Sequence, residues 1–228
     1  MFVDTQIALS SVRVERQVPP RASDSFLLAE RPETAGALFS YRPEEEIYGE
    51  DEPAEFVYKV ISGAVRAYKL LPDGRRQIGA FHLAGDLFGL EASERHQLTA
   101  EAVVETKVVL LKRRTLETLA TRDVQVAYAL WTAAADHLRS AEGRMLLLGR
   151  KTALERVATF LVEMDDRCGK QGKIDLPMTR RDIADYLGLT LETVSRALSQ
   201  LRASGSLRLA STRQVELRRE KLCEKMDG

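Results

Sequence analysis

In the segment from Thr179 to Ser204, one glycine separates two short helical patterns. Thr179 and Asp182 have the spacing of a capping box, in which a hydroxyl and a carboxylate bind free backbone amides at a helix start. Gly188 permits a tight turn before a second helix near Thr190, and the first helix has an apolar side formed by Ile183, Ala184 and Leu187. This spacing predicts a helix-turn-helix.

The second helix of this segment has two distinct faces. An apolar stripe at i, i+4 and i+7 would pack on the first helix; it consists of Val194, Leu198 and Leu201. The opposite face carries Glu192, Ser195, Arg196 and Ser199. Arginine can donate two hydrogen bonds to guanine, glutamate can accept one from cytosine and serine can do either, so this face predicts base contacts in a DNA major groove. The alternative is a solvated ion pair between Glu192 and Arg196, worth about 0.3–0.5 kcal/mol.

Two strand-like segments follow, Ser206 to Leu209 and Gln214 to Leu217, and favour a winged helix-turn-helix over the ion-pair interpretation. The distribution of charge also favours DNA binding by this end of the chain: residues 170–228 hold 12 Lys and Arg against 8 Asp and Glu, whereas the whole chain has 34 of each class. Hydroxyl and guanidinium groups in this region are candidate contacts to the DNA backbone: Thr179, Arg180, Arg181, Thr190, Thr193, Ser199, Arg202, Arg208 and Arg213.

An all-β domain is predicted from Ala37 to about Leu111, where short apolar runs alternate with glycine-containing turns. Its clearest hairpin joins Ala64–Leu71 to Arg75–Phe81 through Pro72-Asp73-Gly74. The polar segment before it is predicted to be a mobile arm.

A long apolar stripe lies between the β domain and the helix-turn-helix, with spacings of three and four: Ala127, Leu130, Trp131, Ala134, Leu138, Ala141, Met145 and Leu148. A continuous helix from Arg122 to Gly149 would be about 42 Å long, more than a small domain needs. The stripe is therefore a candidate dimer interface; the alternative is a core helix packed on the β domain. A further helix is expected from about Thr152 to Asp166.

These patterns divide the chain into an N-terminal arm (1–32), a β domain (33–115), a dimerisation helix (116–149) and a DNA-binding domain (150–228). No apolar segment approaches the roughly 20 residues that cross a bilayer, so we expect a cytoplasmic protein without a membrane partner. Two cysteines, Cys168 and Cys223, lack the spacing of a zinc or disulfide site and are expected to be reduced. We find no catalytic constellation and no metal-ligand spacing, so an enzyme is not expected, and the scattered His82, His96 and His137 receive no role.

This order of elements resembles the CRP/FNR family of bacterial regulators over about Ala37 to Leu217. The likeness rests on Gly63-Ala64-Val65-Arg66, Pro72-Asp73-Gly74-Arg75-Arg76, Gly85-Asp86-Leu87-Phe88-Gly89 and Leu191-Glu192-Thr193-Val194-Ser195-Arg196. It is most similar to the FixK branch, whose members resemble the anaerobic regulator but lack its iron-sulfur cluster. The resemblance implies an α+β fold with an N-terminal cyclic-nucleotide-binding-like β-roll, a long dimerisation helix and a C-terminal winged helix-turn-helix.

By the same resemblance, the chain is expected to be a homodimeric activator that recruits RNA polymerase. Its double-stranded DNA target would be a TTGAT-N4-ATCAA palindrome, read by Leu191, Glu192, Ser195 and Arg196. The resemblance also implies control of genes for microaerobic or anaerobic metabolism or nitrogen fixation.

The β domain departs from the effector-binding patterns of this family. Where the cyclic-nucleotide branch has a glutamate and an Arg-Ser pair, this chain has Leu90 and Leu98-Thr99, so no fixed cation would offset a buried phosphate. Residues 1–167 contain no cysteine to hold an iron-sulfur cluster. We therefore expect no cofactor and DNA binding without an effector. The alternative is a ligand-gated regulator whose β-roll binds an unidentified small molecule. Redox control through either cysteine stays open.

Overall fold

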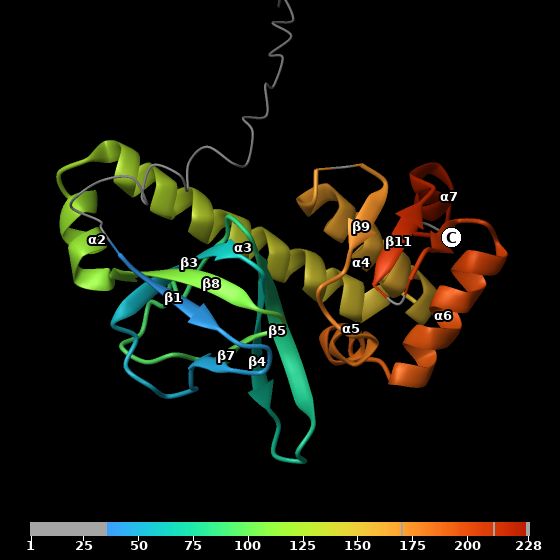
Figure 1. Cartoon of the computed structure of the whole chain (residues 1–228), viewed down its shortest axis with the longest axis horizontal. Coiled ribbons are helices and arrows are strands. Elements are labelled where there is room, and N and C mark those ends of the chain that lie inside the picture. The colour runs from blue at the N-terminus through green and yellow to red at the C-terminus, as the bar shows by residue number, and fades with distance from the viewer. Residues whose placement is uncertain (1–35, 170, 212, 227–228) are drawn as a thin grey trace, which may run out of the picture.

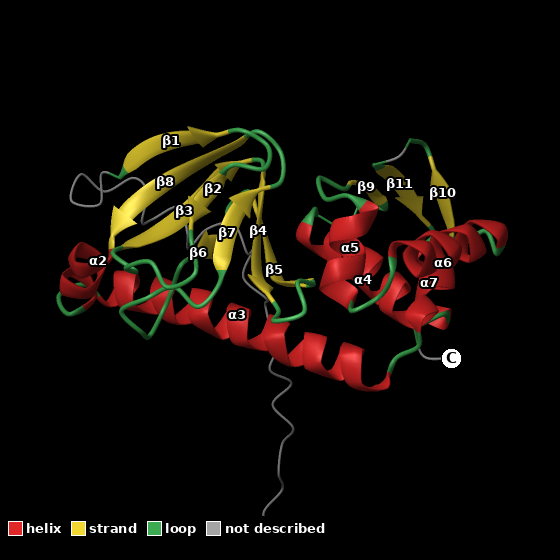
Figure 2. Cartoon of the chain, turned by 90° about the horizontal axis from the view of Figure 1, so that it is seen from below, coloured by secondary structure: helices red, strands yellow, loops and turns green. Residues whose placement is uncertain are grey.

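The computed structural model describes residues 36–169, 171–211 and 213–226; the predicted N-terminal arm, residues 1–32, lies outside them. A β-rich N-terminal part and a largely helical C-terminal part lie side by side (Figure 1). The long helix α3 runs along the β-rich part toward the C-terminal part (Figure 2). The α+β fold class expected from the sequence is confirmed.

The β-rich part consists of two antiparallel four-stranded sheets. One has the order β1 (Ala37–Tyr41), β8 (Thr106–Lys112), β3 (Phe56–Ser62) and β6 (Leu87–Phe88). The other has the order β2 (Glu46–Tyr48), β7 (Thr99–Ala102), β4 (Ala64–Leu70) and β5 (Arg76–Leu83). The predicted hairpin is confirmed, because β4 and β5 pair from Ala64 with Leu83 to Leu70 with Arg76.

Two helices follow the sheets, α2 (Arg113–Ala120) and α3 (Val124–Arg150). The stretch 116–149 is thus not one helix: the side chain of Asp123 accepts a hydrogen bond from the Gln125 amide and starts a new helix there. From Val124 onward α3 is continuous. Its buried residues Val126 and Ala129 pack in an apolar cluster with residues of the β domain.

The C-terminal part is a winged helix-turn-helix. Its elements are α4 (Ala153–Arg167), β9 (Lys173–Asp175), α5 (Arg180–Leu187), α6 (Leu191–Ala203), β10 (Leu207–Leu209), β11 (Gln214–Leu217) and α7 (Arg219–Glu224). The three strands form one sheet in the order β10-β11-β9. The predicted apolar stripe of α6 is buried, with Val194, Leu198 and Leu201 each at most 5% exposed.

The two parts share one hydrophobic cluster. The ring of Phe81 of β5 lies 6.4 Å from that of Phe160 of α4 and 5.1 Å from that of Tyr186 of α5, measured between centroids. Ile78 of β5 is also fully buried in this cluster. Because apolar burial is the main driving force of folding, this contact fixes the C-terminal part against the β-rich part. Over the described residues, no helix combines the length and the apolar character that a bilayer span requires.

Candidate nucleic-acid interface

The helix-turn-helix is fixed locally by three signals that the sequence carries. Thr179 caps α5: its hydroxyl accepts from the Asp182 amide, and the Asp182 carboxylate accepts from the Thr179 amide at 2.9 Å. Gly188 ends α5 in the left-handed region, with φ 63°. Thr190 caps α6 and accepts from the Thr193 amide. The predicted capping box and glycine turn are therefore confirmed.

The polar face of α6 remains accessible at its N-terminal end. Glu192, Arg196 and Ser199 are exposed, while Leu191 and Ser195 are partly exposed. The pKa of Glu192 is lowered mainly by a hydrogen bond from a backbone amide at the helix start and next by the Thr190 hydroxyl. Among the groups that lower this pKa, Arg196 has the weakest effect. The lowered pKa of Glu192 thus comes mainly from the helix start, and pairing with Arg196 contributes little to it.

Basic and hydroxyl groups predicted to contact a DNA backbone surround this face. Arg181, Arg202 and Arg213 are exposed, whereas Arg180 is partly buried. Arg208 pairs with Glu216 across the wing at 2.9 Å, so part of its charge is already compensated. Among the hydroxyl groups, Thr179 and Thr190 serve as helix caps, Thr193 is partly exposed, and the Ser199 hydroxyl donates to a carbonyl of its own helix.

Large apolar side chains stay exposed along α3. Trp131, Leu138 and Met145, which are seven residues apart, are 72%, 60% and 74% exposed. Ala134 is also exposed and Ala127 and Ala141 are partly exposed, but Leu130 and Leu148 pack partly on clusters of their own chain. Exposed apolar side chains of this helix outside the predicted stripe are Val124, Tyr128 and Leu146. A single chain thus leaves an apolar surface on this helix uncovered.

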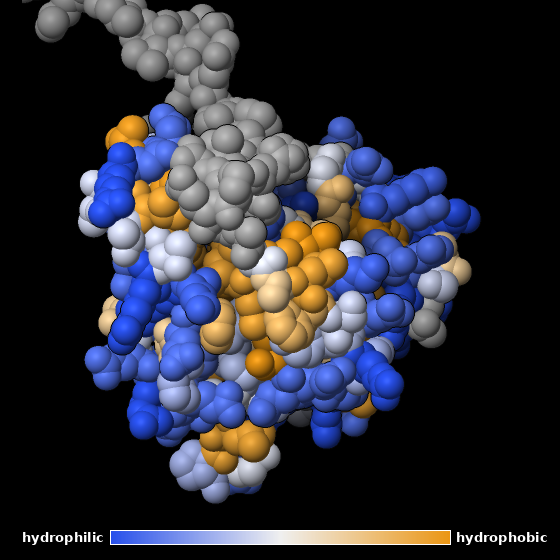
Figure 3. Space-filling model, turned by 60° about the vertical axis from the view of Figure 1, so that its left-hand side comes forward, coloured by the Kyte–Doolittle hydropathy of each residue, from blue (hydrophilic) through white to orange (hydrophobic). Residues whose placement is uncertain are grey.

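Apolar surface also gathers on the α2 side of the molecule, where Figure 3 shows a hydrophobic patch bordered by hydrophilic residues. Exposed large apolar side chains at this end belong to β1 (Leu38 and Phe39) and to the start of α3 (Val124, Tyr128 and Trp131).

The β domain carries apolar or neutral groups at the positions where a nucleotide phosphate would need a cation. Leu90 packs on the apolar cluster beneath α3, and Leu98 packs over Gly79. The Thr99 hydroxyl accepts from the Glu50 amide at 3.0 Å. These three side chains support packing or a turn and leave no positive charge at these positions.

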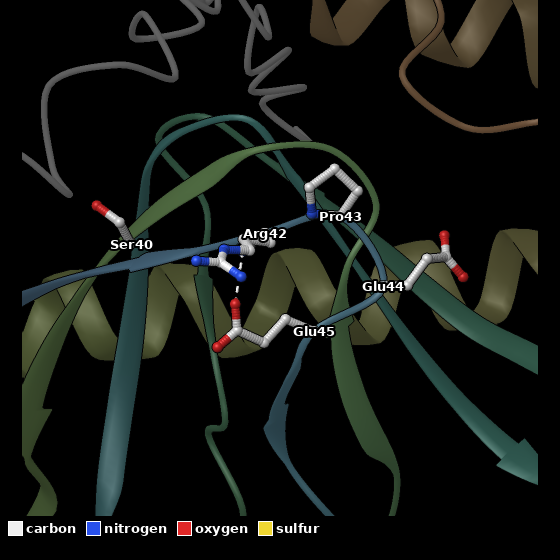
Figure 4. Close-up of a pocket in the computed structure, with 5 residues that line it drawn as sticks. All are labelled: Ser40, Arg42, Pro43, Glu44 and Glu45. Atoms are coloured by element: carbon white, nitrogen blue, oxygen red, sulfur yellow. Dashed lines mark hydrogen bonds between the residues drawn. The ribbon is translucent and has the colours of Figure 1, made fainter.

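A hollow does exist at the turn between β1 and β2, lined by Ser40, Arg42, Pro43, Glu44 and Glu45 (Figure 4). The Arg42 amide donates to the Glu45 carboxylate there at 2.7 Å. Except for Pro43, its lining is polar or charged, so it offers little apolar surface for a nucleobase.

The histidines and cysteines have different environments. His82 and His96 are buried: His82 stacks on Phe88, and His96 stacks on Tyr48. Burial lowers the pKa of His82 well below its ordinary value, and the nearby His137, Arg167 and Arg144 lower it further. Cys168 and Cys223 are exposed free thiols, and partial burial raises the pKa of Cys168.

Comparisons with known proteins identify both parts of the chain. Residues 38–123 match a cyclic nucleotide-binding domain and residues 155–225 match a Crp-like helix-turn-helix domain. The nitrogen fixation regulation protein FixK of Azorhizobium caulinodans is 47% identical over 188 residues, covering 80% of this chain and 76% of that protein. FixK of Rhizobium meliloti is 37% identical over 217 residues, 95% of each chain.

A solved structure agrees with these sequence matches. FixK2 from Bradyrhizobium japonicum superimposes with a TM-score of 0.81 and 62% identity, covering 85% of this chain and 98% of that one. The chain belongs to the CRP/FNR family of DNA-binding transcription regulators, within its FixK branch.

Proposed function

We propose that this regulator is a homodimer that binds a TTGAT-N4-ATCAA palindrome. The observation that carries the proposal is the accessible face of α6 formed by Glu192, Ser195, Arg196 and the adjoining Leu191 on a capped helix. These side chains include a bidentate donor and an acceptor for base edges, and each good bidentate contact discriminates by about 1–3 kcal/mol. The exposed Arg181, Arg202 and Arg213 add contacts to phosphates that fix the register.

The second copy joins through α3. The apolar series Trp131, Leu138 and Met145 repeats every seven residues, the period at which two helices bury a shared seam. Pairing along this seam would cover the exposed side chains and relate two α6 helices by a twofold axis. A twofold pair of recognition helices matches the two halves of a palindrome.

The regulator binds this DNA without a small-molecule effector. Two observations support binding without an effector. Leu90 and Leu98 are engaged in packing, and the described β domain has no cation at the positions where a phosphate would be expected. On its target the dimer recruits RNA polymerase and activates transcription in the cytoplasm. The nitrogen fixation role of the FixK relatives favours genes of nitrogen fixation or of microaerobic and anaerobic metabolism.

The test is a titration of purified protein, free of added ligand, into a fluorescent TTGAT-N4-ATCAA duplex and a scrambled duplex at one stated salt concentration. We expect the palindrome to bind at least about a thousandfold more tightly, the lower end of specificity ratios for such regulators. Equal, weak binding to both duplexes would reject effector-free recognition and favour a ligand-gated regulator.

A further inference from the structure

One buried carboxylate connects the DNA-binding part to the β domain. Asp182, with a side chain 2% exposed, uses Oδ2 to accept from the Thr179 amide and hydroxyl at the start of α5. Its Oδ1 accepts from Arg66 Nη1 at 3.0 Å and from Arg76 Nη2 at 2.6 Å. Asp182, which helps to cap the first helix of the helix-turn-helix, is therefore also held by two arginines of the hairpin β4–β5.

Further carboxylates hold both arginines in place. The side chain of Arg66 is 3% exposed, and its guanidinium also pairs with Glu44 and Glu101. Arg76 also pairs with Asp185, one turn further along α5, at 2.9 Å. Arg66 is thus fixed inside the β domain, whereas Arg76 bridges two carboxylates of α5.

Further contacts of β5 extend along the same helix, which lies beside β5 (Figure 1, Figure 2). The side-chain amide of Gln77 donates from Nε2 to the backbone carbonyl of Asp185 at 2.8 Å. Phe81 packs on Tyr186 of α5. Because polar and apolar contacts act on one helix from one strand, the orientation of α5 depends on the β domain.

These contacts leave the polar face of α6 uncovered. Glu192, Arg196 and Ser199 are all exposed while Asp182 is bound by both arginines. The contact between the two parts therefore holds the helix-turn-helix without blocking the face that would read bases. Such a contact is suited to positioning, since a preorganised binding surface loses less entropy on binding.

We propose that Arg66 and Arg76 are positioning residues for DNA binding: through Asp182 they set the orientation of α5 and α6, and hence the spacing of the two half-sites that a dimer accepts. This inference rests on the proposed function, because half-site spacing has meaning only for a palindrome read by two copies. Removing one cation from the buried cluster leaves carboxylate charge uncompensated, which loosens the contact.

The test compares Arg76→Met with Arg75→Met. Arg75 is the neighbouring residue and pairs with Asp73 of its own hairpin, so its replacement removes the same charge outside the cluster. Each variant is titrated into duplexes with N4 and N6 spacers, which differ in half-site orientation by about 70°. Hydrogen exchange of the amides of residues 180–187 is measured in parallel without DNA.

For the natural sequence and for Arg75→Met we expect the N4 duplex to bind at least about tenfold more tightly than the N6 duplex. In Arg76→Met this preference should shrink severalfold and exchange in α5 should accelerate. A loss of affinity equal for both spacers would indicate a merely structural role and overturn the proposal, as would an unchanged N4 preference. If the natural sequence bound neither duplex, the proposed function would fail and the assignment of half-site spacing to the arginines would fail with it, whereas unchanged exchange in α5 of Arg76→Met would overturn the positioning role by itself.

Discussion

Replacing Leu138 with glutamate should separate the proposed dimer without unfolding the chain. Leu138 is 60% exposed at the centre of the α3 series, so a single chain tolerates a charge there. Burying a whole leucine side chain contributes about 2 kcal/mol, so burying the exposed part contributes about 1 kcal/mol per copy and about 2 kcal/mol per dimer. Two facing carboxylates add repulsion of about 1 kcal/mol. The total of about 3 kcal/mol raises the dimer dissociation constant about a hundredfold.

Sedimentation equilibrium over a range of micromolar concentrations measures this constant. Ser140→Glu is the matched control, because Ser140 is exposed and lies about 200° around the helix from Leu138. The control should dimerise like the natural sequence. If Leu138→Glu dimerised equally well, or if the natural sequence were monomeric throughout, α3 would not be the interface.

Four other substitutions test base reading, phosphate contacts, the buried His82 and the turn at Gly188. Arg196→Ala should lose discrimination at one guanine, whereas Arg213→Ala should weaken binding to all duplexes alike and flatten the salt dependence of binding. If the two variants behaved identically in salt titrations, Arg196 would not be a base-reading residue. The pKa of His82 is lowered in the folded chain, so below about pH 6.5 the unfolded state binds a proton that the folded state does not. The free energy of unfolding therefore decreases by about 1.4 kcal/mol for each unit by which the pH is lowered. His82→Phe should reduce this slope in urea unfolding between pH 7 and 5, and an unchanged slope would show that His82 is not its source. Gly188→Ala should lower the unfolding free energy by about 1 kcal/mol because φ is 63°, with only ordinary contact around the new Cβ; equal stability would contradict a backbone origin.

The elements that the sequence predicted well are those with local signals. The capping box of Thr179 and Asp182, the glycine turn and the hairpin at Pro72–Gly74 each depend on residues within a few positions of one another. The all-β domain and the winged helix-turn-helix followed from the order of such elements, and the β-roll followed from the resemblance to the CRP/FNR family. The polar face of α6 was predictable for the same reason, because helical periodicity alone places its side chains together.

The missed features depend on contacts between distant residues. Arg66 and Asp182 are 116 positions apart, so no local pattern indicates that a helix-capping carboxylate also binds the β domain. The burial of His82 and His96 likewise results from packing against aromatic rings on other strands. Helices α2 and α7 and strand β9 are short, and short elements carry weak periodicity.

In the proposed function, two copies of this chain read one palindrome without an effector. The most direct measurement titrates the unliganded protein into the intact TTGAT-N4-ATCAA duplex and into one with a single scrambled half-site, while analytical ultracentrifugation determines the stoichiometry. The account predicts two chains per intact duplex and binding at least about tenfold tighter than to the half-scrambled duplex, since each mismatched base pair costs about 1–3 kcal/mol. Equal affinity for the two duplexes, or one chain per intact duplex, would contradict it.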